Sequence, residues 1–238
     1  MPPVILWDID GTLVRSNGGR VSVTAFLNAL KTAAAHPDDF DYPKDAGGKT
    51  DEQIALEVLA LAKIAEDRAL ELLADFREYY RIELEREQHN LVGDLRVLPG
   101  VEDTLRTFQE RGVMQTLLTG NLESIARLKL ACAGLDRYVD FELGAYGSDA
   151  RDRTTLVPIS KARIRAKTGL EPDPVIVVGD TPRDVACARA GQAVAVAVAT
   201  AFHTRDQLEA AAPDLVLDDL TNGAAEIEKL LDLATALQ

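Results

Sequence analysis

Three short apolar runs in this chain each end in a turn that carries carboxylate or hydroxyl side chains. In chain order they are residues 4–7 with Asp8-Ile9-Asp10-Gly11-Thr12, residues 114–118 with Thr119-Gly120-Asn121, and residues 175–178 with Gly179-Asp180-Thr181. A lone Asp in such a place is more often a turn or cap residue, but three such turns are hard to explain that way. Because ligands of open α/β sheets bind outside the carboxyl ends of the strands, the three turns can converge on one site.

The carboxylates of these turns suit a divalent cation. Asp8 and Asp10 lie two positions apart, so a continuing strand would direct both to the same side. Two carboxylates held close together repel each other unless a cation lies between them. A hard, oxygen-ligated ion such as Mg²⁺ fits, with Asp180 or Asp184 completing the set, and no cluster of His or Cys favours zinc. The sequence therefore predicts a magnesium site.

The glycines of the same turns suit an anion. Gly11 permits close backbone approach, and the amides beside it can form an anion-binding nest. Gly120 and Asn121 directly precede a helical pattern that begins at Leu122, so a phosphate there would meet N–H groups at the start of a helix. We therefore expect a phosphate-binding site beside the metal.

The composition limits the partners and the location. The formal net charge is −13, and an acidic chain repels nucleic acid and anionic membrane surfaces. No apolar run is long enough to cross a membrane, and the first residues do not read as a signal peptide. Cys132 and Cys187 are expected to be buried, reduced thiols. We predict a cytoplasmic protein with neither a nucleic-acid nor a membrane partner; no feature indicates its oligomeric state.

Apolar runs alternate with helical patterns over most of the chain. Weaker strand candidates cover residues 194–198 and 215–217, and helical patterns cover residues 101–111 and 122–133. Strands that alternate with helices imply parallel pairing and a three-layer α/β sandwich. Residues 21–88, by contrast, carry only helical patterns, which Pro and Gly interrupt.

These motifs resemble those of the haloacid dehalogenase superfamily. The segment Asp8-Ile9-Asp10-Gly11-Thr12-Leu13 is similar to its first motif, Thr119 matches the hydroxyl residue of its second, and residues 179–184 match its acidic fourth motif. The order and spacing agree over nearly the whole chain, and the phosphoglycolate-phosphatase-like branch is the most similar. The resemblance implies a Rossmann-like catalytic core, residues 1–15 and 97–238, with an all-α cap, residues 16–96, inserted after the first strand.

The resemblance also implies a role for each matching residue. Asp8 would attack phosphorus and form an aspartyl-phosphate, while Asp10 would protonate the leaving alkoxide and then deprotonate the attacking water. Thr119 would donate a hydrogen bond to a phosphoryl oxygen, beside the amides near Gly120. The implied Mg²⁺ ligands are the side chain of Asp8, the main-chain carbonyl of Asp10, Asp180, and Asp184 directly or through water.

The third motif of the superfamily supplies a Lys or Arg whose charge would hold the nucleophile ionised. Related phosphatases commonly show Lys-Pro there, and this chain has none. The candidates are Arg153, in a loop, and Lys161, inside a helical pattern; their positions favour Arg153. Gly47-Gly48-Lys49 could similarly be a plain loop before a helix N-cap, or a specificity loop in which Lys49 contacts the substrate.

Taken together, these residues predict Mg²⁺-dependent hydrolysis of a small phosphate monoester. Three alternatives stay open: a phosphomutase of the same fold, a haloacid dehalogenase, and a regulatory protein that binds phosphate without turnover. Asp10 argues against the dehalogenase, which lacks this second acid, and the complete set of carboxylates argues against the regulatory protein. Residues 14–19 and 93–99, with Gly18, Gly19 and Gly93, are the expected hinges of cap motion.

Overall fold

A computed structural model describes residues 3–201 and 203–236. Its main sheet has six parallel strands in the order β5-β4-β1-β6-β7-β8. The strands are β1 (Val4–Trp7), β4 (Met114–Thr119), β5 (Ala145–Tyr146), β6 (Val175–Gly179), β7 (Val194–Val198) and β8 (Leu215–Leu217). Because β1 pairs with β4 on one side and β6 on the other, the three polar turns follow three adjacent strands.

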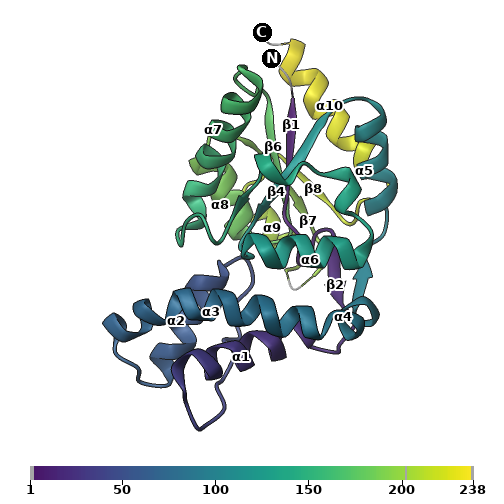
Figure 1. Cartoon of the computed structure of the whole chain (residues 1–238). Helices are drawn as coiled ribbons and strands as arrows, with labels where there is room; N and C mark the ends of the chain where they lie inside the picture. The colour runs from purple at the N-terminus through teal and green to yellow at the C-terminus, as the bar shows by residue number, and fades with distance from the viewer. Residues whose placement is uncertain (1–2, 202, 237–238) are drawn as a thin grey trace.

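Helices cover both faces of this sheet, which confirms the predicted three-layer α/β architecture (Figure 1). One face is covered by α5 (Val101–Glu110), α6 (Glu123–Ala133) and α10 (Gly223–Ala236), and the other by α7 (Leu156–Thr168), α8 (Pro182–Ala190) and α9 (Arg205–Glu209). Short 3₁₀ turns cover Asp136–Tyr138, Phe141–Leu143 and Arg153–Thr155. The last of these carries one of the two third-motif candidates.

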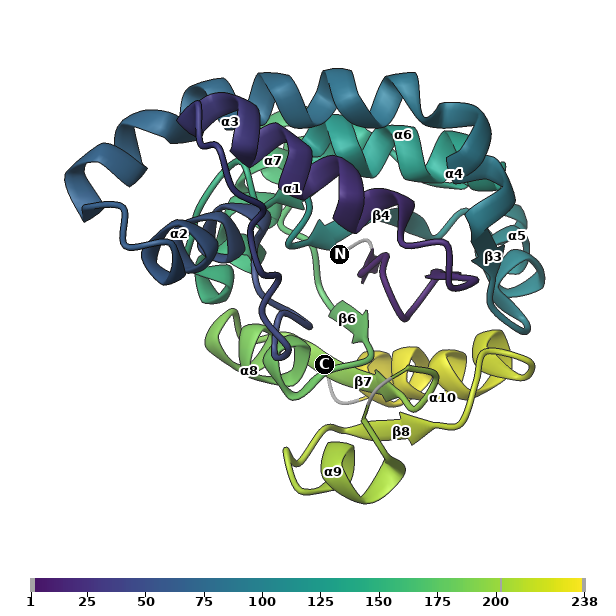
Figure 2. The same ribbon diagram turned by 90° about the horizontal axis from the view of Figure 1, so that it is seen from below.

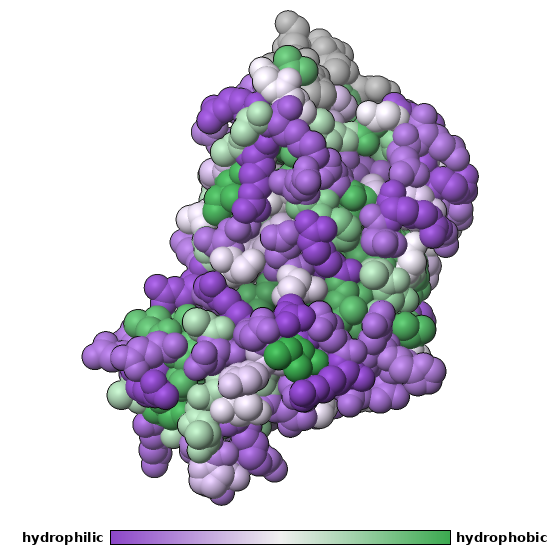
Figure 3. All heavy atoms as spheres, in the orientation of Figure 1, coloured by the Kyte–Doolittle hydropathy of each residue, from purple (hydrophilic) through white to green (hydrophobic). Residues whose placement is uncertain are grey.

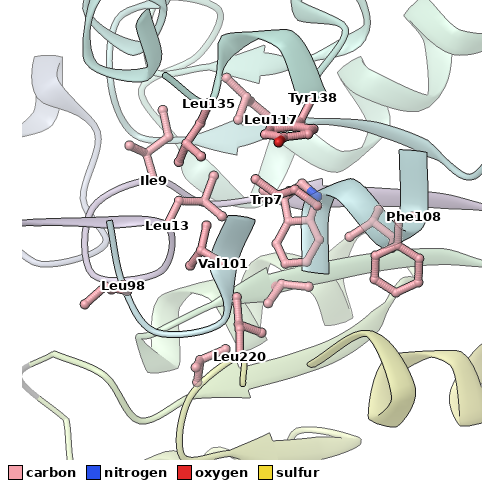
Figure 4. Packing of buried hydrophobic residues seen from close by; sticks show 14 of the residues in the cluster. Trp7, Ile9, Leu13, Leu98, Val101, Phe108, Leu117, Leu135, Tyr138 and Leu220 are labelled. Atoms are coloured by element: carbon pink, nitrogen blue, oxygen red, sulfur yellow. The ribbon is translucent and has the colours of Figure 1, made fainter. Parts of the chain in front are cut away.

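The central strand β1 is buried on both sides because all four of its residues are apolar. Ile5 and Trp7 pack toward α5, where Figure 4 shows the Trp7 ring near Phe108. Val4 and Leu6 face the opposite core, under α7 and α8. The indole Nε1 of Trp7 donates to Gln115 at 3.2 Å, so this ring is a core residue with its polar atom satisfied. The packing fixes the strand that ends at Asp8.

Four helices between β2 and β3 form a second apolar cluster, which we call the helical segment (residues 21–94). They are α1 (Val21–Ala34), α2 (Asp51–Leu61), α3 (Glu66–Arg86) and α4 (Gln88–Asp94). Phe26 of α1 packs edge-on against Phe76 and Tyr80 of α3, with ring centroids 4.9 and 5.3 Å apart. The helical segment lies beyond the carboxyl ends of the strands of the main sheet (Figure 1), and Figure 2 shows the molecule from that end. The segment also packs on α6: Ile125 of this helix and its N-cap residue Leu122 belong to the same cluster.

The two chain connections to the helical segment, which are the predicted hinges, contain short strands. They pair as a two-stranded antiparallel ribbon, β2 (Val14–Ser16) with β3 (Leu95–Val97). Next to it, the buried carboxylate of Asp94 accepts hydrogen bonds from Ser16 Oγ at 2.9 Å, Gly19 N at 2.6 Å and Val21 N at 3.3 Å. Asp94 therefore ties together both connections and the first turn of α1.

The division into core and cap stays a prediction, and residues 1–2, 202 and 237–238 of the predicted core lie outside the described residues. In the described part of the chain, every helix is too short or too polar to cross a membrane. Figure 3 shows a drawn face that is mostly hydrophilic, as the charge composition implies. Cys187 is buried as predicted, but Cys132 is only half-buried, because the C-terminal part of α6 reaches the surface.

Candidate active site

Three buried carboxylates meet at the carboxyl ends of the central strands. Asp8 follows β1, Asp180 follows β6, and Asp184 lies in the first turn of α8. One oxygen from each lies within 4.8 Å of the others, and each residue is at most 4% exposed. A Cβ on Gly11, which has a φ of 89°, would come within 2.3 Å of the Asp180 carboxylate. Glycine at this position therefore lets the first turn pack directly against the acids.

Arg153 lies inside this cluster. Its Nη2 donates to Asp8 Oδ1 at 3.0 Å and also contacts the Asp184 carboxylate, while its Nη1 donates to the carbonyl of Gly48 at 3.1 Å. Lys161, the other third-motif candidate, lies elsewhere: its Nζ donates to the carbonyl of Gly191 at 2.8 Å. The short 3₁₀ turn brings Arg153 to the acids, whereas the position of Lys161 on α7 directs it toward the end of α8.

Crowding and burial raise the pKa values of Asp8 and Asp180. Burial raises the pKa of Asp8 to about 7 against the attraction of Arg153, and the charges of Asp184 and Asp10 add to the rise. Burial, followed by the charges of Asp184 and Asp8, raises the pKa of Asp180 well above its usual value. One guanidinium is therefore too little positive charge to hold the pKa values of Asp8 and Asp180 at their usual level.

A divalent cation would supply the positive charge that this cluster lacks. Asp8 and Asp180 present buried oxygen ligands of the kind that Mg²⁺ prefers. Asp184 is less free, since its Oδ2 accepts from the backbone N–H and the hydroxyl of Thr181 in a capping box at the start of α8. The residues fit a magnesium ion held mainly by Asp8 and Asp180, with Asp184 beside it.

The second acid of the first motif lies in a different environment. The Asp10 side chain is 49% exposed, and both of its oxygens accept hydrogen bonds from Lys129 Nζ, at 2.8 and 2.6 Å. Asn121 Nδ2 donates to Asp10 at 2.7 Å and to the Thr119 hydroxyl oxygen at 3.1 Å. Because Thr119 also accepts from Asn121 N at 3.3 Å, its own proton can point toward a substrate oxygen.

Lys129 is the residue that the sequence interpretation missed. It belongs to α6 and is only 4% exposed, although it carries a charge. A signal was present: Leu122, Ile125 and Ala126 form the buried face of this helix, and Lys129 continues it at the helical spacing. A Lys on a buried helix face needs a partner, which the first-motif acid provides.

The loop before α2 contacts the second-motif turn through its backbone. A Cβ on Gly120 would come within 2.1 Å of the carbonyl oxygen of Lys49, and Asp51 N donates to the carbonyl of Gly120 at 2.7 Å. The side chain of Lys49 turns away from the carboxylate cluster and pairs with Asp45 and Glu57, at 2.9 and 2.7 Å. Two carboxylates of its own segment therefore bind this side chain, and its contact with substrate stays a prediction.

The N-cap of α2 is Thr50, which leaves Asp51 for another contact. The hydroxyl of Thr50 accepts from Gln53 N at 3.2 Å. Asp51 is buried, and its carboxylate accepts from Leu122 N at 2.8 Å, where α6 begins. Burial raises the pKa of Asp51 to about 7 despite the nearby charge of Lys129.

Comparison with known proteins identifies the family of the chain. The model of the haloacid dehalogenase-like hydrolase family matches residues 2–192, and the chain belongs to that family. It is 27% identical to "Probable phosphatase IndB" of Dickeya dadantii, over 99% of this chain and 98% of that protein. It is 28% identical to a phosphoglycolate phosphatase of Synechococcus elongatus, over 90% of this chain and 92% of the relative.

Solved structures share the fold over the full length. A β-phosphoglucomutase from Clostridium difficile superposes with a TM-score of 0.69 at 15% identity, covering all of both chains. A predicted phosphoglycolate phosphatase from Haemophilus somnus gives a TM-score of 0.64 at 20% identity, covering 95% of this chain and 98% of the other. The enzyme is thus a hydrolase of this family with the sheet, the helical layers and the inserted helices of its structural neighbours.

Proposed function

We propose that the protein is a Mg²⁺-dependent phosphatase that hydrolyses a small phosphate monoester through an aspartyl-phosphate on Asp8. The observation that carries this proposal is the pairing of Asp8 with Arg153 inside a buried acidic cluster, with Asp10 on its water-accessible side. A buried carboxylate held by one cation suits a nucleophile, and a half-exposed carboxylate suits proton exchange with water. Relatives named as phosphatases support the same reaction.

The residues divide the reaction into two steps. In the first, an Asp8 oxygen forms a bond to phosphorus as the ester P–O bond breaks, and the leaving alkoxide takes a proton from Asp10. In the second, a water molecule attacks phosphorus, loses a proton to the Asp10 carboxylate and releases Asp8 with inorganic phosphate. Thr119 and the N–H groups beside Gly120 would hold phosphoryl oxygens, and Arg153 would offset charge on Asp8 and the phosphoryl group. A bound Mg²⁺ would neutralise phosphate charge next to the nucleophile.

The size of the substrate is inferred from the relatives and from the segment above the site. The helical segment contacts the second-motif turn, so little room is left for a macromolecule beside the acids. Two of the relatives that match most of the chain are named phosphoglycolate phosphatases, and two others are named pyrophosphatases. We infer a small phosphorylated metabolite, with phosphoglycolate as the first compound to test.

The test measures phosphate release from p-nitrophenyl phosphate and from a panel of metabolite phosphates that includes phosphoglycolate, with Mg²⁺ and with EDTA. We expect Mg²⁺-dependent release that Asp8→Asn abolishes while the circular dichroism spectrum is unchanged. A folded wild-type protein without activity on any of these compounds would contradict the proposal. Interconversion of sugar phosphates without net phosphate release would instead support the phosphomutase alternative.

A further inference from the structure

We infer that Lys129 is a positioning residue that holds the Asp10 carboxylate in place for hydrolysis of the aspartyl-phosphate; this inference rests on the proposed function. The Nζ of Lys129 reaches both Asp10 oxygens, at 2.8 and 2.6 Å, from a helix 119 positions away in the chain. With Asn121 donating at 2.7 Å, the carboxylate is held by two side chains from the second-motif turn and its helix. Its direction is therefore set by α6 and by the turn before it.

The burial of Lys129 indicates that its ion pair with Asp10 is more than a weak surface contact. Its side chain is 6% exposed, while the Asp10 side chain it binds is 49% exposed. An exposed ion pair is worth little, but a buried ammonium must keep its partner because an unpaired charge there is strongly unfavourable. Asp10 consequently has one well-held orientation although it faces solvent, which is what a base that must receive a proton from water requires.

The same contact links the base to the phosphate site and to the helical segment. Asn121 bridges Asp10 and the Thr119 hydroxyl, so the base and a proposed phosphate ligand share one amide. On the other side, Asp51 of the helical segment binds Leu122 N at 2.8 Å, and its charge is close enough to interact with Lys129. Lys129 therefore has the Asp51 carboxylate of the helical segment near it on one side. The packing of α6 places Lys129 Nζ against Asp10.

The two reaction steps depend on Asp10 to different degrees, which makes the inference testable. A nitrophenolate leaving group departs without a proton, so the first step with p-nitrophenyl phosphate needs no acid. The second step always needs a base to deprotonate water. If Lys129 positions Asp10, its loss should slow the second step for every substrate and leave the first step with the aryl ester nearly intact.

The experiment is stopped-flow measurement of nitrophenolate release by wild type and by Lys129→Met. For the variant we expect a burst of about one nitrophenolate per enzyme, followed by a steady state slower than wild type by about 10- to 100-fold, since general base catalysis contributes about 100- to 10,000-fold. Lys129→Arg, which keeps the charge and the donors, should restore most of the turnover and remove the burst. Arg127→Met on the same helix is the matched control, because Arg127 is exposed. Its side chain contacts Glu123 at 2.9 Å and the Phe141 ring at 4.5 Å rather than Asp10.

The kinetics of the variants decide the inference. A burst that is present in Lys129→Met and absent in Lys129→Arg supports it. Wild-type kinetics in Lys129→Met, or an equal slowing of burst and steady state, overturns it. If Lys129→Met does not fold, Lys129→Gln, which keeps a donor and removes the charge, is measured in its place with the same expectations. Hydrolysis by wild type without any burst in the variants contradicts only the role of Lys129, whereas an inactive wild type contradicts the proposed function itself.

Discussion

Replacing Arg153 with Met tests how Asp8, the proposed nucleophile, is held. The substitution keeps most of the side-chain volume and removes the charge that lies 3.0 Å from Asp8 and also contacts Asp184. Two unit charges at this distance interact by about 5 kcal/mol at an effective dielectric constant of about 20. Part of this attraction offsets the desolvation of Arg153, which is 6% exposed, so the net effect must be smaller.

We expect kcat of Arg153→Met to fall by about 100- to 1000-fold, the usual effect of losing one preorganised electrostatic contact in an active site. Without Mg²⁺, the variant should also lose about 3–5 kcal/mol of unfolding free energy, because the buried acids keep no cation. Saturating Mg²⁺ should recover much of this loss by supplying positive charge to the same oxygens.

The assay compares kcat on the best substrate of the panel and urea unfolding with EDTA or Mg²⁺. Lys161→Met is the matched control: it also removes a cation, but one that binds the backbone carbonyl of Gly191 at 2.8 Å. Equal losses of kcat in the two variants, or an Arg153→Met enzyme within threefold of wild type, would refute the reasoning.

Three further predictions follow from buried carboxylates. The pKa of Asp51 is raised from 3.8 to about 7 in the folded protein, so folding takes up a proton between these two values. The unfolding free energy should therefore fall as the pH rises from about 4 to about 7. Asp51→Asn should reduce this slope in urea unfolding, and an unchanged slope would count against the burial argument. Asp94→Ala should lower the unfolding free energy by about 1–3 kcal/mol in urea unfolding, since it leaves the donors of Ser16 and Gly19 without their acceptor. The control is Asp75→Ala, at an exposed position of α3, which should change the unfolding free energy by less than about 0.5 kcal/mol. Asp180→Asn should weaken Mg²⁺ binding in isothermal titration calorimetry at least about tenfold, because a charged ligand is replaced by a neutral one; unchanged affinity would remove Asp180 from the ligand set.

The strands and the acids at their ends could be predicted because their signals are local. Val4 to Trp7 is apolar without interruption, and Asp8 follows directly, so the strand and its polar end are read from one short segment. The same holds for Asp180 after β6. The rule that parallel strands present their carboxyl ends on one edge then brings these residues together without any knowledge of side-chain contacts.

The contacts that hold those acids could not be predicted in the same way. Asp10 and Lys129 are 119 positions apart, and only the packing of α6 against the sheet and the helical segment brings them together. Strands β2 and β3 have three residues each and carry polar side chains, so periodicity gives no usable signal. The choice between Arg153 and Lys161 depended on where α7 begins, and helix boundaries are the least certain part of a sequence-based interpretation.

The two acids of the first motif lie in environments that suit the two different roles proposed for them. Asp8 and Asp10 are separated by one residue, yet the Asp8 side chain is 6% exposed and that of Asp10 is 49% exposed. Each is held by its own buried cation, Arg153 from the loop before α7 and Lys129 from α6. A buried carboxylate beside a fixed positive charge suits attack on phosphorus. A solvent-exposed carboxylate suits proton transfer with water. Because Arg153 and Lys129 come from different elements, the environment of either acid can be altered without moving the strand that presents both.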